Sequence, residues 1–162
     1  FACNWCSYAG ADLAGLSRIQ YPTSQRIIRT MCSGRVDSDF VLHAFEKGAP
    51  IVLVSGCHFA DCHYIDANRW TQKRVEKLWD KLERLGIRPE RLQMEWISAA
   101  EGQRWAKTMT EIDEMRKNVT KEEVKHTIKV LKEDREKAEA KRAKKQNKIT
   151  PKTDSSVIGV PA

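Results

Sequence analysis

The sequence predicts an α/β protein in which an open parallel sheet of about four strands is flanked by helices and followed by a charged helical arm. Short apolar runs of strand length alternate with helical patterns at intervals of about 20 to 30 residues. This alternation is typical of a parallel sheet covered by helices. The last part of the chain differs, because it carries long charged runs with few apolar residues.

The length and the charge distribution support the same division into an α/β domain and a charged arm. The 162 residues suffice for one domain with its own core. The net charge is +7, and the segment from Arg116 to Lys148 holds 13 Lys and Arg against 6 Asp and Glu, while the rest holds 16 of each sign. We therefore expect a neutral α/β domain at 1–117, a charged helical arm at 118–146 and an extended tail at 147–162.

The first predicted elements are a strand end, a loop, a short helix and a second strand. Residues 1–3 resemble the end of a strand, so residues upstream of Phe1 are expected to extend it. Small and polar residues predict a loop over 4–10, and apolar residues at a spacing near three predict a helix over 12–19. The β-branched run 26–31 predicts a strand that ends at Cys32.

The next elements have clearer boundaries. Asp37 or Ser38 can cap a helix that Gly48 ends, and the apolar run 51–54 then predicts a buried strand. The clearest helix lies at about 71–85, where one apolar stripe precedes Gly86. A fourth strand is expected at 92–97.

Two capping boxes begin the last helices. Ser98 with Glu101, and Thr120 with Glu123, have the required spacing of three residues. The second box opens the charged arm, in which an apolar stripe fades after Leu131. Such a helix has too little apolar surface to pack along its whole length. We expect it to project or to lie on another protein, and removal of the chain from about Asn118 should leave the metal site intact but weaken complex assembly.

All five cysteines fall at or just after predicted strands. Cys3, Cys32 and Cys57 follow the first, second and third strands, and Cys6 and Cys62 lie in the adjoining loops. In a sheet of this flavodoxin- or Rossmann-like type, ligands gather at the carboxyl ends of the strands. Neighbouring strands lie about 5 Å apart, so these thiols can converge on one site.

The cysteine set favours metal binding over disulfides. Five is an odd number, and all five cysteines lie within the first 62 residues. Thiolates select iron-sulfur clusters or zinc. An iron-sulfur cluster takes four thiolates, so one cysteine is spare, and the sequence leaves open which one.

Two other uses of the cysteines remain open. Zinc could be held by cysteine pairs together with His58 and His63, as in a zinc-stapled interaction module whose basic helix binds a partner or nucleic acid. Structural zinc usually serves domains without a core, however, and this chain has one. A thiol oxidoreductase could use Cys3 and Cys6 as a dithiol, which leaves three cysteines unexplained. Hydrogen bonding near the thiols, or simple exposure, is the alternative role of both histidines.

Other function classes receive little support. The basic segment from Arg116 to Lys148 contains no aromatic residue, so base stacking along nucleic acid is not expected. There is no Walker loop or Gly-rich dinucleotide motif, which disfavours a self-contained nucleotide enzyme. No stretch approaches 18 consecutive apolar residues and no signal peptide is visible, so a cytoplasmic protein without a membrane span is expected.

Six stretches of the sequence carry a resemblance to a known family. They are Phe1–Tyr8, Gly10–Asp12, Gln20–Pro22, Met31–Arg35, Gly56–His58 and Asp61–Tyr64. Together they resemble the delta subunit of the methyl-viologen-reducing hydrogenase over about residues 1–115. Phe59-Ala60 stands where that family would have Pro-Gly, and the chain after Asn118 lies outside the resemblance.

The resemblance implies an electron-transfer subunit that does not itself turn over a substrate. Members of the family carry a 2Fe-2S cluster. They pass electrons from a nickel-iron hydrogenase, or in some assemblies a formate dehydrogenase, to the flavin subunit of heterodisulfide reductase in a flavin-based bifurcating complex of methanogenic archaea. Cluster ligands are then expected among Cys3, Cys6, Cys32, Cys57 and Cys62. A docking role for the charged arm is our own hypothesis.

Overall fold

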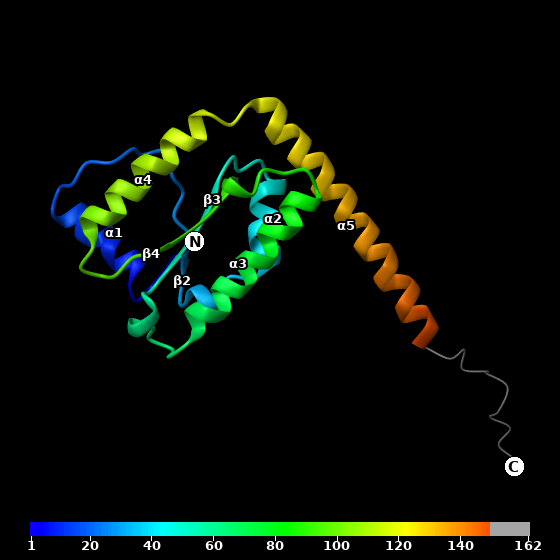
Figure 1. Cartoon of the computed structure of the whole chain (residues 1–162), viewed down its shortest axis with the longest axis horizontal. Coiled ribbons are helices and arrows are strands. Elements are labelled where there is room, and N and C mark those ends of the chain that lie inside the picture. Colours follow the sequence, from blue (N-terminus) through cyan, green and yellow to red (C-terminus); the bar gives the residue numbers. More distant parts are fainter. Residues whose placement is uncertain (150–162) are drawn as a thin grey trace, which may run out of the picture.

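A computed structural model describes residues 1–149 and shows a four-stranded parallel sheet with helices on both faces (Figure 1). The strands run in the order β2-β1-β3-β4, and every neighbouring pair is parallel. Their bounds are Ala2–Cys3 for β1, Arg29–Thr30 for β2, Val52–Gly56 for β3 and Leu92–Trp96 for β4. The predicted α/β class and the four strands are confirmed.

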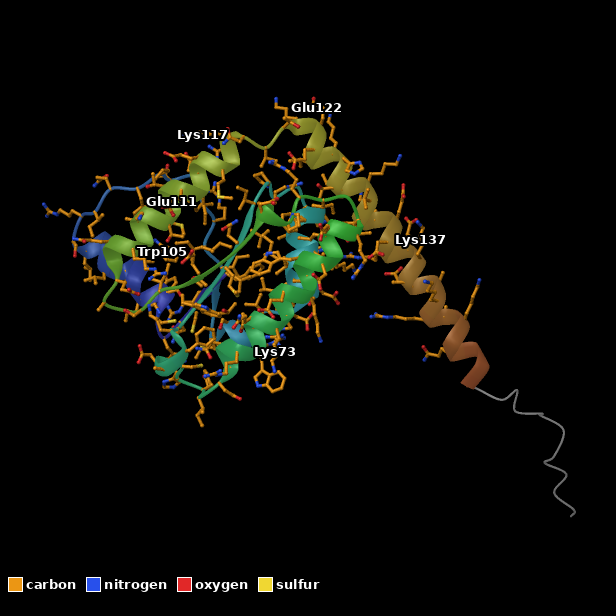
Figure 2. The ribbon with its side chains drawn as sticks, viewed as in Figure 1. Lys73, Trp105, Glu111, Lys117, Glu122 and Lys137 are labelled. Atoms are coloured by element: carbon orange, nitrogen blue, oxygen red, sulfur yellow. The ribbon has the colours of Figure 1, made fainter. Side chains whose placement is uncertain are left out.

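Helices cover the two faces of the sheet in pairs (Figure 1). Helices α1 (Ser7–Leu16) and α4 (Gly102–Lys117) pack on one face around the buried Trp105, which is labelled in Figure 2. Helices α2 (Ser38–Glu46) and α3 (Ala67–Arg84) pack on the other, around Phe45 and Leu82. Three short 3-10 turns join the elements: η1 (Ser33–Arg35), η2 (Phe59–Asp61) and η3 (Pro89–Arg91).

Most of the predicted start and stop signals operate as expected. The Asp37 carboxylate accepts a hydrogen bond from the Asp39 amide at 2.9 Å, and the Thr120 hydroxyl accepts one from the Glu123 amide at 3.1 Å. Gly48, just past α2, has a left-handed backbone with φ of +91°, which glycine adopts without steric cost. These local signals set the ends of the elements because they act within one helical turn.

Two predicted boundaries near the N-terminus were wrong. The expected loop over 4–10 is helical from Ser7, because α1 begins directly after Cys6 and Gly10 packs against the loop before α4. A Cβ on Gly10 would lie 2.9 Å from the Ser98 carbonyl oxygen, so the small residue serves helix packing. The expected strand 26–31 is reduced to β2, since β1 offers only two residues for pairing.

Helix α5 (Lys121–Ile149) is joined to the body along its first half. Leu131 is buried in the core beside α2 and α3. Two ion pairs reach the same surface: Lys81 to Asp134 at 2.8 Å and Arg135 to Glu46 at 2.8 Å. Beyond them the helix extends away from the body (Figure 1), and Lys137 lies on this helix (Figure 2).

A buried guanidinium anchors the start of α5. The Arg91 side chain is almost fully buried and donates to the carbonyl oxygens of Pro50 at 2.7 Å and Ala49 at 3.3 Å. It also donates to the hydroxyl of Thr127 on α5. Burial lowers the pKa of Arg91, while Glu123, 3.8 Å away, favours the charged form. The charged arm therefore supplies partners that this buried cation needs.

Two expectations made from the sequence concern the C-terminal part and the membrane. Most of the predicted extended tail at 147–162 lies outside the described residues, and α5 continues to Ile149. Among helices of residues 1–149, none is long and apolar enough to cross a membrane.

Candidate metal centre

The strand order places two cysteines at the point where the chain changes direction across the sheet. From β1 the chain passes to β2 on one side and then crosses to β3 on the other side of β1. In open parallel sheets, ligands bind outside the carboxyl ends of the strands at such a switch point. Cys3 ends β1, and Cys57 directly follows β3. Their side chains therefore meet at the predicted edge.

Three thiols converge there. The Sγ atoms of Cys3, Cys6 and Cys57 all lie within 4.8 Å of one another, and those of Cys3 and Cys57 are 3.9 Å apart. All three side chains are buried. Cys6 reaches the site because the chain turns into α1 immediately after it. An all-sulfur, water-shielded donor set of this kind suits soft metal centres.

The thiols strongly affect one another's ionisation. Hydrogen bonds from the thiols of Cys57 and Cys6 stabilise the Cys3 thiolate and lower the pKa of Cys3 to about 2. The same thiolate raises the pKa of Cys57 to about 11 and also raises the pKa of Cys6. One negative charge is thus favoured and further ones are opposed, which is the condition that a bound cation relieves.

The other two cysteines lie beside this group in different ways. Cys62 is half-buried and packs against the three thiols from the loop after β3. Cys32 is buried at the start of η1, where its Sγ accepts a hydrogen bond from the Gly34 amide at 3.3 Å. Burial is the main factor that raises the pKa of Cys32. The structure thus gathers three of the five cysteines, with Cys62 in contact and Cys32 to one side.

Within the described part of the chain, neither His58 nor His63 joins the group formed by the three thiols. The Nε2 atom of His58 lies 2.7 Å from the Glu101 carboxylate. That carboxylate also accepts from the Ser98 amide, and these two contacts, the amide first, lower the pKa of Glu101. His63 stacks on Trp5 with ring centroids 3.9 Å apart. Both rings therefore line the loops around the thiols.

Sequence reasoning missed Asn68, which holds the loop after β3 in place. Its buried amide donates to the carbonyl oxygens of Cys57 at 3.1 Å and His58 at 2.9 Å. A polar residue among the buried positions of an amphipathic helix was the available signal, because a fully buried amide needs partners. Asn68 therefore orients Cys57 toward the other thiols.

The end of β3 admits only a very small residue. A Cβ on Gly56 would lie 2.6 Å from the Ser33 hydroxyl oxygen and 2.8 Å from the Trp96 ring. This close approach brings η1 and β4 against the strand that carries Cys57. A separate cavity of about 310 Å³ lies at the opposite edge of the sheet, lined by Phe1, Ile28 and Leu53, away from the thiols.

Most of the chain, including all five cysteines, matches a known protein family. The family model described as methyl-viologen-reducing hydrogenase, delta subunit, matches residues 1–120. The chain belongs to this family. All five cysteines lie inside the matched segment, and α5 begins just beyond it.

Two similar proteins are named as iron-sulfur subunits of a hydrogenase. The chain is 54% identical over 112 residues to an iron-sulfur subunit of the F420-non-reducing hydrogenase of Methanococcus voltae, and the match covers 69% of this chain and 78% of that protein. It is 47% identical over 112 residues to the iron-sulfur subunit of the same name from Archaeoglobus profundus, where the match covers 69% and 82% of the two chains.

A delta-subunit segment also occurs inside a much longer protein. The chain is 54% identical over 111 residues to one subunit of the ferredoxin:CoB-CoM heterodisulfide reductase of Methanosarcina mazei. The match covers 68% of this chain but only 14% of that longer protein. In Methanosarcina mazei, a domain like this one is therefore part of a single longer polypeptide.

Proposed function

We propose that this protein is a non-catalytic electron-transfer subunit that holds a 2Fe-2S cluster on four of its five cysteines. The observation that carries the proposal is the convergence of three buried Sγ atoms within 4.8 Å at the switch point of the sheet. Four thiolates complete the ligand set of such a cluster. The family and the iron-sulfur names of its members support iron rather than another soft metal.

Cys62 is the best candidate for the fourth ligand. It contacts the three converging thiols and comes from the same loop as Cys57. Cys32 is then the spare cysteine, placed to influence the cluster through its neighbouring thiols. The position of His58 and His63 around the site, rather than in the sulfur group, supports their role in shielding the site rather than in ligating zinc.

The names of the relatives support our choice of electron donor and acceptor. Two iron-sulfur relatives are named for a hydrogenase, and a heterodisulfide reductase polypeptide contains a homologous segment. When two domains are joined in one polypeptide in one organism, the corresponding separate chains of other organisms are candidates to bind each other. We therefore assign the flavin subunit of heterodisulfide reductase as the acceptor, with a hydrogenase or formate dehydrogenase as donor in a bifurcating complex.

Metal analysis of the anaerobically purified protein tests this function. Iron and labile sulfide are expected in equal amounts, together with an electron paramagnetic resonance signal that appears on reduction. A reducing cytoplasmic setting fits the proposal, since all five cysteines are free thiols in the structure. Stoichiometric zinc without iron would contradict it, and so would a reversible Cys3–Cys6 disulfide in a metal-free protein.

A further inference from the structure

Large apolar side chains are exposed around the thiol site. Among the exposed large hydrophobic residues of the described chain, six lie in the loops at the carboxyl edge of the sheet or in the first turn of α3. They are Trp5, Met31, Phe59, Tyr64, Ile65 and Trp70, and together we call them the apolar rim. Exposed apolar residues that cluster in this way are typical of protein interaction sites.

The apolar rim is interleaved with the cysteines. Trp5 precedes the buried Cys6, and Met31 precedes the buried Cys32, with the Met31 carbonyl oxygen 3.9 Å from the Sγ of Cys3. His63 stacks on Trp5 and meets the ring of Tyr64 edge-on at 5.1 Å. A protein that covers the rim would therefore lie directly over the sulfur atoms.

Ile65 is the most unusual member of the rim. Its side chain is 87% exposed, and its backbone is left-handed with φ of 67°. A β-branched residue rarely adopts this conformation, because its side chain crowds the backbone. Here the amide of Ile65 donates to the Cys62 carbonyl oxygen at 2.9 Å, which holds the turn. The fold thus presents an isoleucine to solvent without gaining core packing from it.

Cations surround the rim and are held by aromatic rings. The cation-ring pairs are Arg29 over Tyr8 at 4.5 Å, Arg69 over Phe59 at 5.5 Å and Lys73 over Trp70 at 4.8 Å (Lys73 in Figure 2). Two carboxylates, Asp61 and Asp66, lie in the same loops, and Asp66 accepts from the Trp70 indole at 3.3 Å. Cations at the border of an apolar patch favour a partner with an apolar centre and acidic edges.

We infer that the apolar rim is the docking surface for the protein that exchanges electrons with the thiol site, and that Ile65 is an anchor of this interface. The inference rests on the proposed function, since electron transfer falls steeply with distance and needs the partner close to the cluster. The partner presents an apolar surface edged with carboxylates. The flavin subunit of heterodisulfide reductase is the protein with which we test it.

The test compares Ile65→Asn with Leu16→Asn in the full-length, anaerobically purified protein. Leu16 is a matched control, since it is 83% exposed at the end of α1 and lies outside the rim. The Kd for the cognate flavin subunit should rise about tenfold or more in Ile65→Asn and stay unchanged in Leu16→Asn. Asparagine tolerates left-handed backbone, so the Tm of Ile65→Asn should be equal to or above that of the wild type.

A charge variant gives a second measurement. Arg69→Glu should weaken binding and reduce the salt dependence of the Kd, because it removes a cation facing the acidic edges of the partner. Unchanged Kd values in both Ile65→Asn and Arg69→Glu would overturn the inference. A wild-type protein that dimerises alone, and becomes monomeric as Ile65→Asn, would assign the rim to a second copy instead.

Iron and sulfide measured on the same samples separate the two proposals. Wild-type protein without iron would overturn the proposed function. Protein that contains the cluster but binds the flavin subunit equally well as the wild type, as Ile65→Asn and as Arg69→Glu would overturn only the docking surface. Cluster-containing protein that does not bind the flavin subunit would also overturn the assignment of this surface.

Discussion

At the residue scale, Cys3 lies at the centre of the site. It ends the central strand β1, and its thiolate accepts from both of the other converging thiols. Because that first charge raises the pKa of Cys6 and Cys57, the fully deprotonated set needs positive charge nearby. Metal binding at this site should therefore release protons and weaken as pH falls.

Substitutions can distinguish the roles of Cys62 and Cys32. Cys62→Ser should lose most of its iron, because it replaces the thiol that packs against the other three. Cys32→Ser should retain iron with a shifted reduction potential, since the Cys32 sulfur is engaged by the Gly34 amide at the edge of the site. Iron and sulfide per chain, with redox titration of the retained cluster, measure both effects. The reverse result would make Cys32 the fourth ligand.

At the scale of the elements, the backbones of α1 and α4 approach closely because glycines lie at their contact. Gly10 of α1 faces the Ser98 carbonyl before α4, and a Cβ on Gly102 of α4 would lie 2.9 Å from the Ala14 amide nitrogen. Both glycines are buried. Close contact between α1 and α4 determines the position of Cys6, since α1 starts directly after it.

Alanine substitutions in α1 test this packing with a control in the same helix. Gly10→Ala should lower the free energy of unfolding by about 1–3 kcal/mol, because the new methyl group meets backbone. Gly15→Ala should raise it by about 0.5–1 kcal/mol, since that position is exposed with no atom near the new methyl group and alanine favours the helix. Urea denaturation measures both. Equal effects would show that α1 does not pack as closely as the structure has it.

At the scale of the whole molecule, the charged arm begins inside the body and ends outside it. Its first half buries Leu131 and gives the buried Arg91 a partner, whereas its second half carries exposed charges away from the sheet (Figure 1). A division of the chain at Asn118 therefore cuts through packed structure. A division after Arg135 follows the surface of the body, and the docking role of the part beyond it stays a prediction.

Two truncations test where the body ends. Deletion of residues after Arg135 should change the Tm by less than about 2 °C and leave the iron content intact, because the side chains of residues 136–144 are all exposed. Deletion after Asn118 should lower the Tm by on the order of 10 °C, since Leu131 and the Thr127 contact to Arg91 are lost. Thermal denaturation with iron analysis measures both. A stable protein ending at Asn118 would show that α5 is independent of the body.

Sequence alone determined the helix ends of this protein and the cysteine side chains available for its site. Caps such as Asp37 and Thr120, and the stop at Gly48, act through contacts within one turn, so they were readable in the chain. The cysteines at strand ends could be predicted to share one edge because parallel strands all end there. The family resemblance came from the residues around those same cysteines.

Tertiary structure decided the remaining features, because they depend on contacts between distant parts of the chain. The order β2-β1-β3-β4 places Cys3 beside Cys57, and no local pattern specifies strand order. Cys32 stays to one side because it lies two residues past β2, where η1 begins and the Gly34 amide binds its Sγ. Asn68 reaches the cysteine loop only after α3 has packed on the sheet, and Arg91 contacts Thr127 only after α5 has packed on the body. Residue types therefore specified a thiol site, and long-range packing selected which thiols form it.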